Sequence, residues 1–246
     1  MTEPREQSTF QPWNEHPGPA ARTSGGIPNA AAAARVRDWP AYFAKVDGKP
    51  ARETLTAALD AFDAERASDA TSGQEPPLAV DLGCGSGRDT LELLARGWRV
   101  HAIDGHPEAL ARLLSQPEFR PTPALTMEMA TFEQIRRLPR CRLLNASFSL
   151  PFCPPPAFAR LWSAAMDAIE PGGRFAGQLF GDRDSWAIIE DRSHFTRPEA
   201  EALLADLDIE RFDEEERPGQ DASDNHKHWH VFHIIARKPG PPGGHP

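Results

Sequence analysis

The feature that most restricts the fold of this chain is a strand, a glycine-rich turn and a helix in direct succession. Residues 78–82 (LAVDL) suit a short buried strand, and Gly83, Gly85 and Gly87 follow at alternate positions before a helix predicted over 89–96. Glycine permits a sharp turn and lets a ligand approach the bare backbone. The start of the following helix offers unpaired N–H groups to ligand oxygens. The segment therefore predicts a nucleotide-type site at the end of a strand.

The rest of the chain alternates between strand and helix patterns. Further strands are predicted at 98–103, 124–129, 142–148, 174–180, 209–212 and 229–236, and helices at 52–65, 107–114, 132–138, 157–169 and 200–207. The strand over 229–236 has apolar residues on both faces, as an interior strand has. This alternation is typical of an α/β fold with a doubly wound, mostly parallel sheet.

Composition limits the remaining classes. Residues 1–37 and 239–246 are rich in Pro, Gly and polar residues, so we expect a mostly disordered N-terminal tail, one domain over 38–238 and a flexible C-terminal tail. The three cysteines form no CxxC pair, which argues against a disulfide framework. No secretory signal or membrane-spanning run is present, so a cytoplasmic protein without a membrane partner is expected. The net charge of −9 argues against a nucleic-acid partner.

Two acidic residues near the glycines discriminate between possible ligands. The dinucleotide fingerprint G-x-G-x-x-G would need a glycine where the chain has Arg88, and the Walker Gly-Lys-Ser/Thr is absent. Asp81 would repel a pyrophosphate but suits a cationic amino group, and Asp104, at the end of the second strand, can accept bonds from both ribose hydroxyls. Together they describe S-adenosyl-L-methionine. A dinucleotide such as NAD and a tight turn without a ligand are the alternatives.

Three segments make the chain resemble the class I S-adenosylmethionine-dependent methyltransferases. VDLGCGSG looks like their glycine motif, HAIDGHPEAL like their ribose-binding motif, and IEPGGRFAGQLF like the turn before their fifth strand. The tract over 83–104 is similar in style to the tellurite-resistance branch of this family. The resemblance covers about 39–238. It implies a Rossmann-like sheet of seven strands in the order 3-2-1-4-5-7-6, with the last strand antiparallel and helices on both faces.

The resemblance also assigns cofactor-binding positions. It places the methionine end at Asp81, Gly83, Cys84, Gly85 and Gly87, the ribose at Asp104, the adenine beside Gly105, His106, Ala130, Thr131 and Phe132, and the sulfonium at Asn145, Ala146 and Ser147. The family often has an Asp near the adenine amino group, and 130–132 lack one.

The sequence says less about the molecule that accepts the methyl group. The Asp/Asn-Pro-Pro-Tyr motif of base methylation is absent after the fourth strand, so we expect methyl transfer to a small molecule by in-line displacement. The resemblance places Trp39, Tyr42, Phe180 and Trp186 beside the transfer site. His228 is the candidate general base, although solvated histidines or a metal site are alternatives for the His-rich strand, and no metal is predicted. A non-catalytic cofactor-binding scaffold and a protein or nucleic-acid methyltransferase are the rival functions.

Overall fold

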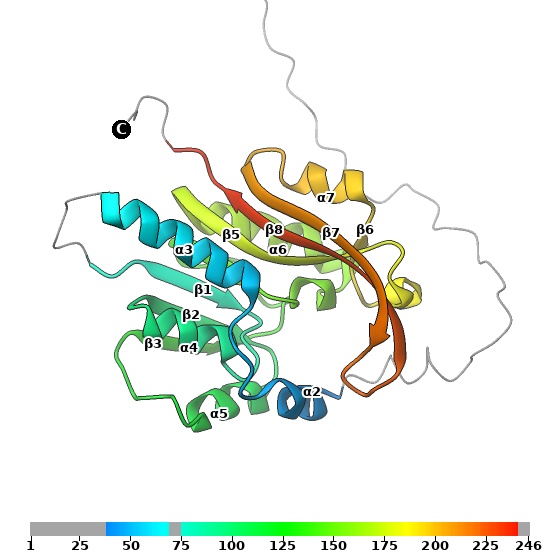
Figure 1. Ribbon diagram of the computed structural model, residues 1–246, viewed down its shortest axis with the longest axis horizontal. Coiled ribbons are helices and arrows are strands. Elements are labelled where there is room, and N and C mark those ends of the chain that lie inside the picture. The colour runs from blue at the N-terminus through cyan, green and yellow to red at the C-terminus, as the bar shows by residue number, and fades with distance from the viewer. Residues whose placement is uncertain (1–37, 69–74, 241–246) are drawn as a thin grey trace, which may run out of the picture.

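The computed structural model describes residues 38–68 and 75–240 (Figure 1). The predicted N-terminal tail and nearly all of the predicted C-terminal tail lie outside these residues.

One mixed sheet runs through the described part of the chain. Its main path has the order β3-β2-β1-β4-β5-β8-β7, and the short strand β6 pairs with β5 off this path. The first five strands along the chain pair in parallel, whereas β8 is antiparallel to both of its neighbours, β5 and β7. The strands are β1 (Leu78–Leu82), β2 (Arg99–Asp104), β3 (Leu125–Met129), β4 (Cys141–Ala146), β5 (Ile169–Gly181), β6 (His194–Phe195), β7 (Asp208–Gln220) and β8 (His226–Arg237). The predicted order and the antiparallel last strand are confirmed.

Helices cover both faces of the sheet. One apolar core contains buried residues of α3 (Glu53–Ser68), α4 (Arg88–Ala95) and α5 (Pro107–Ser115), with Trp98 among the largest. The other contains buried residues of α6 (Pro155–Ala168) and α7 (Arg197–Leu203), including Phe158 and Trp162. The predicted capping box of α7 is present, because Thr196 and Glu199 bond each other's backbone N–H. The sheet is therefore buried on both sides, as doubly wound topology requires.

Two sequence predictions are wrong in detail. The helix expected over 132–138 is a single turn, in which Gln134 bonds Thr131 from both backbone and side chain, and only Ile135 of its apolar residues is fully buried. The strand expected over 209–212 continues to Gln220. Its acidic part has no apolar alternation, but Glu214 bonds Arg183 and Arg197 across the surface. Ion pairs and ladder bonds to β8, rather than apolar burial, hold this extension.

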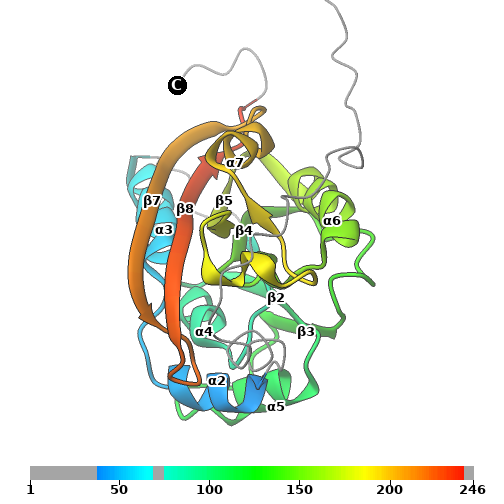
Figure 2. The same cartoon turned by 90° about the vertical axis from the view of Figure 1, so that its right-hand side faces the viewer.

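Helix α2 (Trp39–Val46) lies across the carboxyl ends of the parallel strands, between α5 and the turn that joins β7 to β8 (Figure 2). Lys45 of α2 contacts Asp224 and the carbonyl of Asp221 in that turn. At the same C-terminal end of α2, Asp47 accepts a bond from Arg112 of α5 at 3.1 Å. The helix thus connects the two sides of the edge where ligands bind in such sheets.

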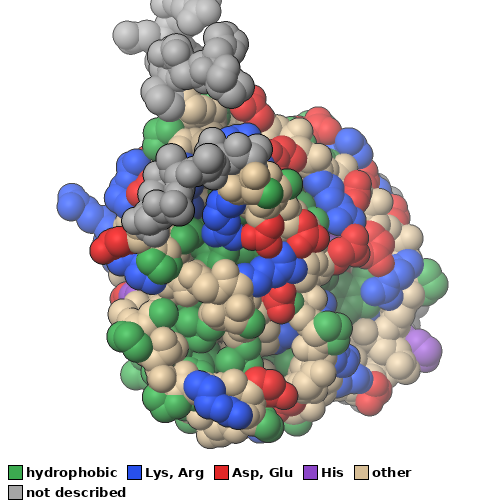
Figure 3. Space-filling view, turned by 60° about the vertical axis from the view of Figure 1, so that its left-hand side comes forward, with side chains coloured by type: hydrophobic (Ala, Val, Ile, Leu, Met, Phe, Trp, Pro, Cys, Tyr) green, Lys and Arg blue, Asp and Glu red, His purple; other side chains and the backbone are tan. Residues whose placement is uncertain are grey.

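On the face in Figure 3, basic and acidic side chains are interspersed over the upper half, with apolar side chains below.

Candidate functional site

The turn after β1 has a backbone that requires glycine. Gly83, Gly85 and Gly87 all have positive φ angles, of 76°, 54° and 90°. A Cβ atom at Gly83 would overlap the side chain of Ser149, and one at Gly87 would lie 2.5 Å from Cγ of Leu113. The predicted loop is therefore present, and it packs closely against the segments that follow β4 and form α5.

Asp104 lies at the end of β2 with its carboxylate beside this loop. Its Oδ2 accepts a bond from the backbone N–H of Gly85 at 2.9 Å, and its Oδ1 accepts one from His106 at 2.8 Å. Burial raises the pKa of Asp104, and these two N–H bonds oppose the rise. The carboxylate is thus fixed next to the glycines, as the sequence predicts.

Two further carboxylates are buried behind the loop. Asp81 accepts bonds from Nδ2 of Asn145 at 2.9 Å and from Oγ1 of Thr90, while Asp89 accepts from the same Asn145 nitrogen at 3.1 Å and from the backbone of Arg52. Burial, together with the charge of Asp89, raises the pKa of Asp81 to about 7. Such a cluster favours a cation and repels a pyrophosphate. Asn145 was predicted to face the sulfonium, but its amide is bonded to these acids.

The other predicted cofactor residues gather around Asp104. Ala130 donates its N–H to the Asp104 carbonyl at 3.1 Å, and Thr131 lies 3.2 Å from the Cβ position of Gly105. The ring of Phe132 lies 3.5 Å from the Cβ position of Gly83. Cys84 and Ala146 are buried in the two cores, and burial raises the pKa of the Cys84 thiol, which keeps it neutral.

Two aromatic rings adjoin this region. Nδ1 of His106 is buried and has no hydrogen-bond partner in the described part of the chain. Phe43 of α2 packs 5.7 Å from the His106 ring and 3.6 Å from the Cβ position of Gly85, and it is only 2% exposed. Family resemblance places Phe43, with Trp39 and Tyr42, beside the transfer site, and its ring also contacts those two neighbours.

A second group of side chains, which we call the aromatic cluster, lies beyond β4 and β5. Phe152 is at its centre, with ring centroids 4.9 Å from Trp39, 6.2 Å from Phe180 and 6.0 Å from Trp186. The structure thus brings together the predicted acceptor residues, with Tyr42 at 5.9 Å from Trp39. The cluster comprises Trp39, Phe148, Phe152, Phe180, Trp186 and Trp229. All of its members except Phe180 are partly exposed.

Phe148 stands out within the aromatic cluster. It follows the end of β4 with a φ of 52°, which is uncommon for a bulky residue. Its N–H donates to Oε1 of Gln178 at 2.9 Å, and Gln178 in turn donates to Oγ1 of Thr54 at 2.8 Å. Its ring lies 6.5 Å from that of Trp229. Strained residues that the surroundings hold in place are common at functional sites.

Comparison with known proteins agrees with this geometry. The family model described as "Methyltransferase domain" matches residues 79–173. These residues form a class I methyltransferase domain. Proteins of this class use S-adenosylmethionine, and the fold has the sheet order found above. The sequence analysis named this class, and the match confirms it.

Solved structures of low sequence identity share the fold of the methyltransferase domain. NodS, an N-methyltransferase from Bradyrhizobium japonicum solved with S-adenosyl-l-homocysteine, has a TM-score of 0.58 at 16% identity, covering 85% of this chain and 97% of NodS. TehB from Haemophilus influenzae has a TM-score of 0.58 at 17% identity, covering 73% of this chain and 61% of TehB. A Burkholderia thailandensis 1,6-didemethyltoxoflavin-N1-methyltransferase has a TM-score of 0.53 at 20% identity, covering 89% and 93%.

One curated relative matches over a short segment. A probable cobalt-precorrin-6B C(15)-methyltransferase (decarboxylating) of Methanothermobacter thermautotrophicus is 59% identical over 34 residues, which is 14% of this chain. The matched segment spans 18% of the length of that relative.

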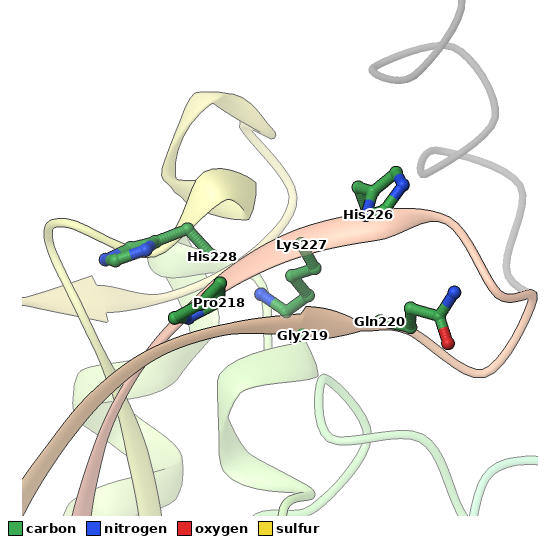
Figure 4. A pocket seen from close by; sticks show the side chains of 6 residues that line it. All are labelled: Pro218, Gly219, Gln220, His226, Lys227 and His228. Atoms are coloured by element: carbon green, nitrogen blue, oxygen red, sulfur yellow. The ribbon is translucent and has the colours of Figure 1, made fainter.

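On β8, Lys227 is a buried cation that the sequence analysis missed. An open hollow of about 640 Å³ at the end of the β7–β8 hairpin is lined by Pro218, Gly219, Gln220, His226, Lys227 and His228 (Figure 4). Lys227 points to the opposite side of β8 from His226 and packs against Trp229 and Trp186 of the aromatic cluster. Its alternation with Trp229 and Val231 on one strand face is the signal in the sequence that could have found it.

The side chain of His228, the predicted general base, faces β7. It is 44% exposed, and its Nε2 is 2.9 Å from Oε1 of Glu216. The backbone of His228 bonds Oγ of Ser185, the residue before Trp186. His230, two residues on, is buried against Glu214. The described residues contain no group of three His, Cys, Asp or Glu side chains that could hold a metal.

The helices of the described residues are too short or too polar to cross a bilayer.

Proposed function

We propose that this protein transfers a methyl group from S-adenosylmethionine to a small-molecule acceptor, with residues 38–238 as the catalytic domain. The observation that carries the proposal is the position of the Asp104 carboxylate. It is fixed beside the glycine turn by two backbone N–H groups, at the same sheet edge as a partly exposed aromatic cluster.

The residues on the cofactor side fit such a ligand. Bound S-adenosylmethionine supplies a methyl group on a positively charged sulfur. Asp104 would accept the ribose hydroxyls in charge-assisted bonds. Asp81 and Asp89 would favour the cationic end of the ligand. His106, whose Nδ1 has no partner in the described residues, has a hydrogen bond to offer the base. Glycine at 83 and 87 lets the turn pack against Ser149 and Leu113, where a Cβ atom would clash.

The acceptor side would position and desolvate a small molecule. The partly exposed rings around Phe152 provide flat apolar surfaces beyond the end of β4. Placing the acceptor in line with the methyl group and excluding water supply much of the rate enhancement in such reactions. A small acceptor also agrees with the net charge of −9, which disfavours nucleic acid. The Burkholderia neighbour was solved with 1,6-didemethyltoxoflavin, a small molecule.

The experiment divides a cell extract by size. The purified protein is incubated with methyl-labelled S-adenosylmethionine and either the dialysable fraction or the retained macromolecules of the same extract. We expect label to appear in the dialysable fraction. Label in retained protein or nucleic acid would instead support a macromolecular acceptor. Absence of label from both, with normal cofactor binding, would support the non-catalytic scaffold.

The matched control is Asp104→Asn, which keeps the side-chain shape but removes the charge, and whose amide oxygen can accept only one of the two bonds from Gly85 and His106. Labelling that depends on this site should fall strongly in the variant. Equal labelling by the variant and the parent protein would show that a contaminating enzyme or another site is responsible.

A further inference from the structure

We infer that the acceptor is a flat, conjugated organic acid that binds as its anion, with Lys227 as the counter-cation. This inference rests on the proposed function and specifies its acceptor class. The juxtaposition that carries it is a buried ammonium group among the rings of the aromatic cluster.

Lys227 is 3% exposed, and its ammonium faces several rings. Nζ lies 4.0 Å from the centroid of Trp186, 4.2 Å from Trp229 and 5.1 Å from Phe180. The carboxylate that contacts it is Asp184, which also accepts bonds from the backbone of Trp186 at 2.9 Å and of His230 at 3.2 Å. Asp184 thus pairs with Lys227 and is held in place by two backbone N–H groups. Desolvation lowers the pKa of Lys227 to about 8, because burial disfavours the charged ammonium form.

Two guanidinium groups add positive charge around the same rings. Cζ of Arg192 lies 4.0 Å from the Trp186 centroid and 5.1 Å from Phe152. Cζ of Arg52 lies 4.3 Å from the Phe148 ring. Three cationic side chains therefore contact the aromatic cluster. Asp184 pairs with Lys227 in the interior, and the exposed Asp191 lies 4.0 Å from Arg192.

This arrangement selects the charge of the acceptor. Aromatic cages bind cationic ligands when their ring faces are open. Here protein cations already occupy ring faces, so a cationic acceptor would meet like charges in a partly desolvated space. A flat anion would stack on the exposed parts of Trp186 and Trp229 and complement the ammonium of Lys227. Because Asp184 already pairs with Lys227, the attraction also depends on Arg192 and Arg52 beside the same rings.

Methylation of an anionic acceptor requires no general base, because the acceptor has no proton to lose. A lone pair of the anionic acceptor forms the new bond to the methyl carbon while the bond from sulfur to that carbon breaks. Its electron pair stays on sulfur, which becomes a neutral thioether, and the acceptor becomes a neutral methyl ester or ether. No proton is released in the transfer. The position of His228 outside the aromatic cluster agrees with this scheme.

Three probes of one shape test the charge preference. The protein saturated with S-adenosylhomocysteine is titrated with 2-naphthoate, 2-naphthamide and 2-naphthyltrimethylammonium, and binding is followed by calorimetry. We expect 2-naphthoate to bind at least tenfold more tightly than either of the other two. Equal or tighter binding of the amide or the cation, or failure of 2-naphthoate to bind, would overturn the inference.

Substitution assigns the preference to Lys227. In Lys227→Met the advantage of 2-naphthoate should fall by about tenfold. Lys238→Met is the matched control: Lys238 lies just after the other end of β8, and its Nζ donates to carbonyls of Met166 and Ile169. This control should keep the full preference. An unchanged preference in Lys227→Met would overturn the role of Lys227.

A second variant guards against misfolding, because Lys227→Met leaves Asp184 buried without its cation. The double variant Lys227→Met with Asp184→Asn replaces the ion pair with neutral groups, and it should also lose the preference. Binding of S-adenosylhomocysteine distinguishes failure of the proposed function from failure of the acceptor assignment. If S-adenosylhomocysteine fails to bind the parent protein, the proposed function fails and this inference fails with it. If it binds normally and 2-naphthoate has no advantage, only this inference fails.

Discussion

The proposed cofactor side and the proposed acceptor side share one edge of the sheet but differ in the charged side chains around them. Beside the glycine turn lie three carboxylates, on Asp81, Asp89 and Asp104. Around the aromatic cluster lie the cations of Lys227 and two arginines. A cation on one side and an anion on the other would therefore each meet complementary charge. We infer that methyl transfer at this edge turns the cationic cofactor and the anionic acceptor into neutral products.

The largest effect is expected from removing one charge on the cofactor side. Asp104→Asn should weaken S-adenosylhomocysteine binding about a hundredfold, because two charge-assisted bonds worth on the order of 3 kcal/mol together are lost. Its melting temperature should fall only slightly, since the Asn amide oxygen still accepts one of the two backbone bonds, although its NH2 group cannot accept the other. Calorimetry and thermal unfolding measure the two quantities. Parent-like affinity in the variant would make Asp104 a purely structural residue.

The difference between the two sides also explains what sequence reasoning could find. On the cofactor side, Asp81, the glycines and Asp104 fall within 24 successive residues. Strand and helix periodicity place such neighbours directly, so both their positions and the fold around them were predictable. The turn at 132–138 was not, because its short apolar pattern fits a helix, although a side chain of Gln134 bonds the backbone instead.

The acceptor side depends on contacts that no local pattern encodes. Trp39 meets Phe152, and Lys227 meets Trp186, across many intervening residues. Sequence alone grouped some of these aromatic residues through family resemblance. Strand alternation could have placed Lys227 on the face of Trp229 and opposite His228, but it could not show that Trp186 meets Lys227 there.

The next largest effect is a change of about tenfold in cofactor affinity with pH, which we expect on the cofactor side. The raised pKa of Asp81, about 7, means that this carboxyl is mostly neutral at pH 6 and mostly ionised at pH 8. A ligand with a cationic amino group prefers the ionised form. Its affinity should therefore rise roughly tenfold between these pH values, with release of a proton on binding. Calorimetric titration of S-adenosylhomocysteine in buffers of different ionisation enthalpy measures both.

The control ligand for this pH profile is methylthioadenosine, which keeps the nucleoside but lacks the amino-acid portion. Its affinity should not vary with the ionisation of Asp81. A flat profile for S-adenosylhomocysteine, or an equal slope for both ligands, would contradict the assignment of Asp81 to the amino group.

The smallest effect is expected at His228. His228→Ala removes an exposed ion pair with Glu216, and such pairs contribute about 0–1 kcal/mol to stability. Cofactor affinity and the rate of methyl transfer should both stay within about twofold of the parent values. A large loss of rate with unchanged cofactor affinity would restore His228 as a base and would weaken the case for an acceptor bound as its anion.

The central claim is that the acidic side of the edge holds S-adenosylmethionine. Parallel calorimetric titrations with S-adenosylmethionine and NAD test it most directly, because NAD carries a pyrophosphate that Asp81 and Asp89 would repel. We expect saturable binding of S-adenosylmethionine in the micromolar range and no binding heat with NAD. Binding of NAD together with no binding of S-adenosylmethionine would contradict the account.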